Sequence, residues 1–195
     1  MKKRVVIGVG GNIGAGKTTV ARMFKAYGMK YISADRIGWQ VLEEIAGDLR
    51  KYFGEGIFLG KKINRKCLRD LVFSNPRYLK ILNRLSHPRL LARIDEKLEG
   101  IKRGMVVIDA ALLFDWPKLL KKIDYPILVK APLAFKRERA QTKGIPSSIF
   151  THILRSQKSE REMAKLAKFI INNKGTIGQL KKECLRILKE IKNDC

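Results

Sequence analysis

The chain has few residues of the kinds that build disulfide frameworks, zinc sites or membrane spans. Its 195 residues include three cysteines and two histidines. Cys67, Cys184 and Cys195 are odd in number, far apart and without Cys-x-x-Cys spacing, which argues against a disulfide framework and a zinc site. No apolar run approaches the roughly 20 residues needed to cross a membrane. We therefore expect a cytoplasmic protein, without a membrane segment and large enough for one sizeable core.

Acidic residues are also scarce. The sequence holds 42 lysines and arginines against 18 aspartates and glutamates, a net charge of +24. A field of this sign attracts polyanions such as nucleic acids and polyphosphate metabolites, although a lysine-rich surface of the thermophilic kind is a third explanation. The basic residues are spread along the whole chain and no nucleic-acid-binding module is recognisable. We therefore expect a small-molecule partner rather than a nucleic acid, and the sequence does not indicate an oligomeric state.

One glycine-rich stretch organises the rest of the chain. Residues 11–18 read Gly-Asn-Ile-Gly-Ala-Gly-Lys-Thr, which fits the phosphate-binding pattern Gly-x-x-x-x-Gly-Lys-[Ser/Thr]. The apolar run Val5 to Val9 precedes it and a helical pattern follows it, as this motif requires. Backbone N–H groups in such a turn hold phosphate oxygens, and the positive end of the helix strengthens the anion site. Lys17 is expected to reach the β- and γ-phosphates of a nucleotide, and Thr18 to ligate Mg²⁺.

Apolar runs alternate with helical patterns along the chain. Five of these runs are predicted to be strands, at residues 5–9, 30–33, 105–109, 125–129 and 169–172. Their alternation with helices predicts an α/β fold whose parallel sheet is covered on both faces.

The block from residue 48 to residue 103 differs from the rest of the chain. It has helical periodicity and no convincing strand, so we expect a helical insertion that forms a substrate pocket. Within it, Asn75-Pro76 and His87-Pro88 are each predicted to begin a helix.

Two aspartates follow predicted strands. Asp35 comes just after the second strand and Asp109 ends the third. Because ligand sites in parallel sheets lie beyond the carboxyl ends of the strands, Asp35 should meet the phosphate loop at one edge of the sheet. Asp35 is expected to accept the proton of an acceptor hydroxyl or to position Mg²⁺, and it also suits the start of the helix near Arg36. Asp109 fits either a magnesium carboxylate or an ordinary strand-end aspartate.

Basic residues surround Gly144, between two predicted helices. Arginines there could close over a triphosphate and stabilise the charge on a transferring phosphoryl group, or they could belong to a solvated surface. The candidates are Arg137, Arg139, Arg155 and Arg161.

Together these motifs resemble the dephospho-CoA kinase family, over nearly the whole chain. Besides the phosphate loop, the resemblance rests on Ser33-Ala34-Asp35, Phe53-Gly54, Asn64-Arg65, Val72-Phe73, His87-Pro88, Leu112-Leu113-Phe114, Gln157 and Asn173. It implies a P-loop kinase fold: a five-stranded parallel sheet flanked by helices, with a helical substrate-binding insertion and a lid. It also implies transfer of the γ-phosphoryl group of ATP, with Mg²⁺, to the 3′-hydroxyl of dephospho-CoA, the last step of coenzyme A synthesis. The alternatives are a P-loop kinase for another small metabolite, such as a nucleoside monophosphate, and a nucleic-acid-stimulated ATPase.

The resemblance also assigns regions and residues. It implies a nucleotide-binding core at residues 1–35, 104–135 and 160–195, an insertion at 36–103 and a lid at 136–159. The expected catalytic residues are Lys17 and Asp35, and the expected magnesium ligands are Thr18 and Asp109. The expected ATP contacts are Asn12, Ile13, Gly14, Ala15, Gly16, Lys17, Thr18, Thr19, Arg139 and Asn173. The expected substrate contacts are Asp35, Arg65, His87, Leu112 and Leu113.

The chain departs from the family's pattern at several positions. The family usually has aspartate at the position of Ser33, proline at that of Ala111 and aspartate at that of Lys168. Counting from Pro132, Glu138 and Thr142 occupy the positions of the family's two lid arginines, next to Arg137 and Arg139. These departures leave the residues for phosphoryl transfer in place and bear on the identity of the acceptor.

Overall fold

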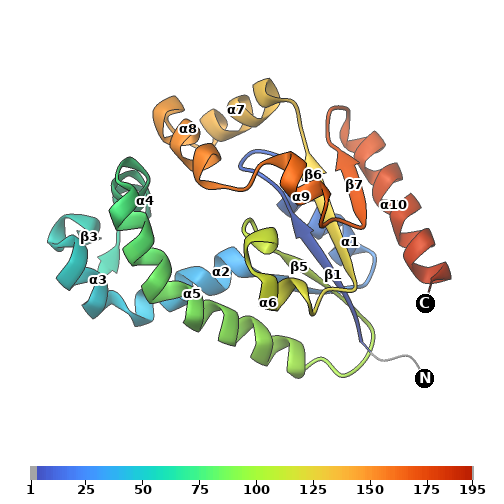
Figure 1. Cartoon of the computed structure of the whole chain (residues 1–195), viewed down its shortest axis with the longest axis horizontal. Helices are drawn as coiled ribbons and strands as arrows, with labels where there is room; N and C mark the ends of the chain where they lie inside the picture. Colours follow the sequence, from blue (N-terminus) through green and yellow to red (C-terminus); the bar gives the residue numbers. More distant parts are fainter. Residues whose placement is uncertain (1–3, 195) are drawn as a thin grey trace.

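A sheet of five parallel strands forms the centre of the computed structural model, which describes residues 4–194 (Figure 1). The strands stand in the order β2-β5-β1-β6-β7, so that β1 lies in the middle between β5 and β6. They are β1 (Val5–Gly10), β2 (Lys30–Ser33), β5 (Met105–Asp109), β6 (Tyr125–Lys130) and β7 (Phe169–Asn172). All five predicted strands are present and pair in parallel, which confirms the predicted α/β fold.

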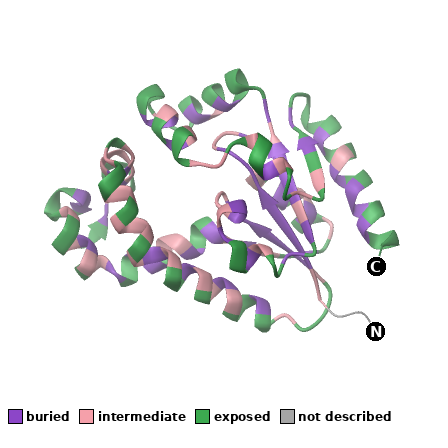
Figure 2. Ribbon diagram, viewed as in Figure 1, coloured by how far each residue is buried: buried purple, intermediate pink, exposed green. Residues whose placement is uncertain are grey.

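Helices cover both faces of this sheet, and alternate residues of each strand point into two separate apolar clusters. On one face Ile7 and Val9 of β1 pack with residues of α1 (Lys17–Ala26) and α10 (Ile177–Asn193). On the other face Val6 packs with residues of α2 (Ala34–Glu44), α5 (Pro76–Glu99) and α6 (Pro117–Leu120). The three inner strands β5, β1 and β6 are consequently buried along most of their length (Figure 2), which explains their nearly continuous apolar sequence.

The insertion extends away from the sheet and has its own apolar cluster (Figure 1). It contains the far part of α2, α3 (Ala46–Phe53), α4 (Arg65–Ser74) and the first half of α5. A short turn of 3₁₀ helix (Glu55–Ile57) leads into an antiparallel hairpin, β3 (Phe58–Leu59) and β4 (Lys62–Ile63). The prediction that this block contains no strand is therefore wrong. Strands of two residues are too short to show an alternating pattern in the sequence.

Helix α5 begins after Asn75 as predicted, and the Asn75 side chain accepts a hydrogen bond from Arg77 N at 3.0 Å. The predicted second start at His87-Pro88 is wrong, because Pro88 lies inside this one continuous helix. An internal proline lacks the N–H that the helix needs and costs about 3 kcal/mol. Burial of Leu90, Ile94 and Leu98 in the core beyond the proline outweighs this cost.

A helix pair, α7 (Leu133–Thr142) and α8 (Ser147–Ser156), stands above the insertion in Figure 1. Buried Lys136 of α7 forms an ion pair of 2.9 Å with Glu160 of α9 (Glu160–Ala164) and so anchors the pair to the core. A second 3₁₀ turn (Leu113–Asp115) follows β5. Within residues 4–194, no helix is both long enough and apolar enough to span a membrane.

Candidate active site

The glycine-rich loop joins β1 to α1, and its glycines determine its shape. Gly14 and Gly16 have φ angles of 74° and 99°, a region that other residues rarely adopt. A side chain at Gly14 would overlap the backbone of Lys136, and one at Gly16 would overlap the amide of Asn173. The loop therefore takes a tight path that ends where α1 begins, at Lys17. The first N–H groups of that helix have no helical partner and can bind an anion there.

Two side chains from other elements hold the back of this loop. Asn173, which follows β7, is buried and donates from Nδ2 to the Ala15 carbonyl at 2.8 Å. Arg139 of α7 donates to the carbonyls of Gly14 and Ala15 at 3.3 and 3.4 Å. Both residues were expected to contact ATP. Here they bind carbonyl oxygens at the back of the loop, so neither side chain occupies a loop N–H group that could hold phosphate.

The front of the loop meets the end of α8. The side-chain oxygen of Gln157 accepts a hydrogen bond from Ile13 N at 2.9 Å. Asn12, buried at 3% exposure, donates from Nδ2 to the Lys158 carbonyl at 3.2 Å. Hydrogen bonds from the rest of the protein therefore hold the loop on both sides.

Lys17 and Asp35 line one cleft of about 560 Å³ between the loop, α2, α5 and the α7–α8 pair. Burial lowers the pKa of Lys17, and the negative charges of Asp35 and Asp109 offset part of this shift. The pKa of Asp35 is raised, first by burial and then by the charge of Asp109, although its carboxylate is open to the cleft. The Ser33 hydroxyl, and not Asp35, caps α2 by accepting from Arg36 N at 3.3 Å. The capping alternative for Asp35 is therefore wrong, and its carboxylate is available in the cleft.

Asp109 lies at the end of β5, opposite Ser33 of β2 in the sheet register, and is 4% exposed. The Tyr31 hydroxyl donates a hydrogen bond to its Oδ2 at 3.0 Å. The charge of Asp109 affects the pKa of both Lys17 and Asp35, so the three groups interact electrostatically. The contact from Tyr31 was missed, because a tyrosine in a strand gives no sign of its hydroxyl's partner.

The donor set suits a magnesium ion that is shared with phosphates. Within residues 4–194 no three His, Cys, Asp or Glu side chains stand together as a metal cluster. Mg²⁺ in kinases needs few protein ligands, because phosphates and water supply the rest. The Thr18 hydroxyl at the cleft and the nearby carboxylates of Asp35 and Asp109 are oxygen donors of the kind that Mg²⁺ prefers.

The far wall of the cleft comes from the insertion and from the segment after β5. Leu112, one of the expected substrate contacts, lines it. Leu113, also expected to contact the substrate, does not line the cleft and is fully buried beneath Gly8 and Gly10. Arg65 lies outside the cleft, in a side pocket next to Trp39.

His87 also lines the cleft, where its ring contacts Trp116 edge-on with centroids 5.3 Å apart. Trp116 Nε1 donates to His87 Nδ1 at 3.4 Å, a contact that requires an unprotonated Nδ1. Burial lowers the pKa of His87 below its ordinary value of about 6.5.

A pH-dependent loss of stability is expected from His87. Its folded-state pKa is lower than its unfolded one, so the unfolded chain binds the proton more readily. The contribution of His87 is present above about pH 6.5 and decreases as the pH falls through the folded-state pKa. Urea unfolding at about pH 7.5 and about pH 5.5 should show a smaller loss of stability for His87→Asn than for the wild type. The exposed His152 on α8 gives a matched control, His152→Asn, which should keep the wild-type dependence. Identical losses in His87→Asn and the wild type would contradict the assignment.

Of the four candidate arginines, only Arg139 lines the cleft. Arg137, Arg155 and Arg161 are exposed. Two further cations that line the cleft were missed, Lys143 at the end of α7 and Arg69 of α4. Lys143 is close enough to Asp35 and Lys17 to influence the pKa of each. In a chain with 42 basic residues, nothing in the sequence distinguished these two from the rest.

This chain is similar in sequence and in fold to known proteins. The model of the family described as dephospho-CoA kinase matches residues 5–179. A dephospho-CoA kinase from Aquifex aeolicus is 32% identical over 96% of this chain and 98% of its own length. One from Dehalococcoides mccartyi is 36% identical over 94% of this chain and 95% of its own length. The solved structure of a dephospho-CoA kinase from Campylobacter jejuni superposes with a TM-score of 0.70 at 28% identity, covering 98% of this chain and 100% of that one. The match to the family model spans most of the chain, so this protein belongs to the dephospho-CoA kinase family.

Proposed function

We propose that this protein transfers the γ-phosphoryl group of ATP to the 3′-hydroxyl of dephospho-CoA, giving coenzyme A and ADP. The observation that carries the proposal is the position of Asp35. Its carboxylate faces the same cleft as Lys17 and the glycine-rich loop, and neither caps a helix nor forms an ion pair within the described chain. A phosphate cradle beside an available carboxylate is what phosphoryl transfer to an alcohol requires.

In this proposal the loop binds the phosphates of ATP. The backbone N–H groups at the start of α1 hold phosphate oxygens, and Lys17 lies beside the β- and γ-phosphates. Lys17 Nζ now donates to the Asn12 carbonyl at 3.0 Å, and it would exchange that oxygen for a phosphate oxygen. Bound Mg²⁺, held by Thr18 with Asp109 nearby, would neutralise charge on the β- and γ-phosphates.

Asp35 would accept the proton from the acceptor hydroxyl as the new O–P bond forms. Its raised pKa makes the carboxylate a stronger base than an aspartate with an ordinary pKa. The bond from the γ-phosphorus to the bridging oxygen breaks on the opposite side, and ADP leaves. The cations Arg139 and Lys143, from the α7–α8 pair, lie beside the cleft and would stabilise the charge that spreads over the phosphoryl oxygens.

The proposal also assigns a role to each region of the chain. Residues 36–103 bind the acceptor and residues 136–159 act as the lid, while the remainder of the described chain binds ATP. A cytoplasmic location completes the proposal, supported by the free thiols of Cys67 and Cys184; Cys195 lies outside the described residues.

Lys143→Ala should lower kcat by about tenfold, because one charge-assisted contact to phosphate contributes about 1.5–3 kcal/mol. The matched control is Arg137→Ala, which removes an exposed cation of the same helix that does not line the cleft. Steady-state rates with ATP and dephospho-CoA measure both variants. Equal rates for Lys143→Ala and Arg137→Ala would remove Lys143 from the site.

A panel of acceptors tests the proposed function itself. Acceptor-dependent ADP formation should be fast with dephospho-CoA and slow with nucleoside monophosphates or with water alone. Preferential turnover of a nucleoside monophosphate would show that the acceptor is a different one.

A further inference from the structure

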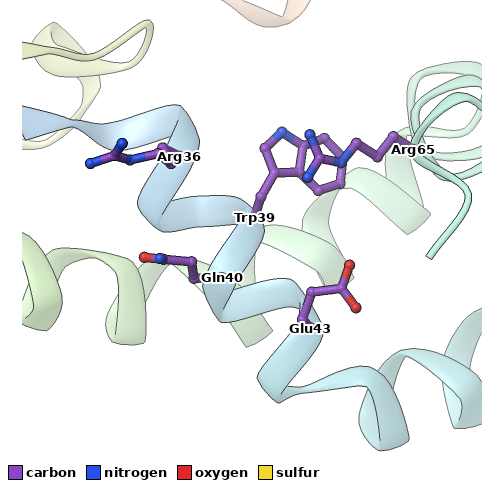
Figure 3. Close-up of a pocket in the computed structure, with 5 residues that line it drawn as sticks. All are labelled: Arg36, Trp39, Gln40, Glu43 and Arg65. Atoms are coloured by element: carbon purple, nitrogen blue, oxygen red, sulfur yellow. The ribbon is translucent and has the colours of Figure 1, made fainter. Parts of the chain in front are cut away.

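A second pocket, of about 350 Å³, lies beside the cleft on the outer face of α2. Arg36, Trp39, Gln40 and Glu43 line it at a spacing that places them on one side of the helix, and Arg65 faces them from the start of α4. Figure 3 shows the Arg65 guanidinium over the indole of Trp39, with Arg36 and Glu43 at opposite ends of the row. Trp39 also lines the central cleft, so the two hollows share a wall.

The two arginines in this pocket have unused hydrogen-bonding capacity. The Arg65 guanidinium lies over the Trp39 ring, 4.3 Å from its centroid, in a cation–π contact. Across the described chain, neither Arg36 nor Arg65 has a carboxylate within ion-pair distance. By contrast, Arg50 lies 4.1 Å from the Phe58 ring and forms an ion pair of 2.6 Å with Glu55. Arg65 is therefore held in place by an aromatic ring and lacks the acidic partner that Arg50 has.

The acceptor of the proposed reaction carries a matching group. In dephospho-CoA a diphosphate is attached to the 5′ position of the same ribose whose 3′-hydroxyl would receive the phosphoryl group. A ribose that presents its 3′-hydroxyl to Asp35 has room to place its diphosphate at Trp39, the residue that the cleft shares with this pocket. Arg36 follows Asp35 directly in the chain, and the pocket lies around that turn of α2.

We infer that Arg36 and Arg65 bind the diphosphate of the acceptor, and that Trp39 holds the Arg65 guanidinium in the plane needed for this contact. This inference rests on the proposed function. Guanidinium groups bind phosphate through two parallel hydrogen bonds, which a lysine cannot reproduce. This pocket therefore selects acceptors that carry a diphosphate.

Glu43 determines which end of the pocket the diphosphate occupies. It is separated from Arg36 by about 10 Å along the helix, at 1.5 Å per residue. A carboxylate beside the diphosphate would be repulsive, so the diphosphate binds toward Arg36 and Arg65. The uncharged pantetheine arm of the acceptor passes Glu43.

Calorimetric titration in the absence of ATP tests the inference. Arg65→Ala should weaken binding of dephospho-CoA by about tenfold, the loss of one charge-assisted contact, and leave binding of adenosine unchanged. Arg36→Ala should behave in the same way, and Arg65→Lys should recover part of the affinity. The matched control is Arg50→Ala, which removes an arginine from an aromatic ring elsewhere in the insertion and should bind both compounds as the wild type does.

Three results would overturn the inference. They are unchanged dephospho-CoA affinity in Arg65→Ala, an equal loss of affinity for adenosine, and weaker binding of dephospho-CoA by Glu43→Gln. Failure of the proposed function is distinguishable from these, because it would appear as a wild-type protein that binds dephospho-CoA without phosphorylating it.

Discussion

Replacing Lys17 with alanine should reduce kcat by about 10²–10³-fold while the protein stays folded, since this is the usual effect of removing one preorganised donor from a transition state. Lys17 is the only lysine of the glycine-rich loop, and its amine now contacts the Asn12 carbonyl. The loop offers no second lysine, and Arg139 already donates from its guanidinium to the carbonyls at the back of the loop.

Steady-state rates at saturating ATP and acceptor measure this effect, with circular dichroism to confirm folding. Lys25→Ala provides the control, because Lys25 is exposed in the last turn of the same helix. It should retain the wild-type rate. A Lys17→Ala variant with a rate close to that of Lys25→Ala would contradict the proposed contact with the phosphates.

Asp35→Asn should lower kcat by about 100-fold or more and leave the affinity for ATP unchanged, because an amide cannot accept the proton of the acceptor. The amide has nearly the same shape, so packing should be preserved. The pKa of Asp35 is raised mainly by burial and by Asp109, so the substitution also removes a charge whose desolvation opposes folding. The stability of the variant should therefore equal or exceed that of the wild type.

The matched control for Asp35 is Asp48→Asn. Asp48 occupies the first turn of α3, as Asp35 occupies that of α2, and it does not line the cleft. Kinetics and nucleotide titration on both variants separate catalysis from binding. A wild-type kcat in Asp35→Asn would remove Asp35 as the base, and a parallel loss of ATP affinity would assign it to nucleotide binding.

Features that depend on local patterns were predictable from the sequence. The strands and the phosphate loop carry their signals within a few neighbouring residues, as uninterrupted apolar runs and as glycine spacing. The meeting of Asp35 with Lys17 followed from one general rule, that the carboxyl ends of parallel strands face one edge of a sheet. The structure places both side chains in one cleft, as that rule predicts.

Features that depend on tertiary contacts were not predictable. His87-Pro88 looks like a helix start, but the buried leucines and isoleucine that follow keep α5 continuous. Leu112 and Leu113 are chemically identical neighbours, and only the packing beneath Gly8 and Gly10 separates a cleft residue from a core residue. Lys143 enters the site because α7 is anchored through Lys136 and Glu160. An ion pair between two distant residues of this kind produces no periodic pattern in the sequence, so it could not be predicted.

The most direct test of the account is to identify the product made from ATP, Mg²⁺ and dephospho-CoA by the purified protein. Phosphorus NMR and mass spectrometry should detect coenzyme A, with one new phosphate monoester on the 3′-oxygen and one ADP for each phosphate transferred. A phosphate at any other position, or ADP formed at the same rate without the acceptor, would contradict the claim that Asp35 directs an alcohol toward the nucleotide in the loop.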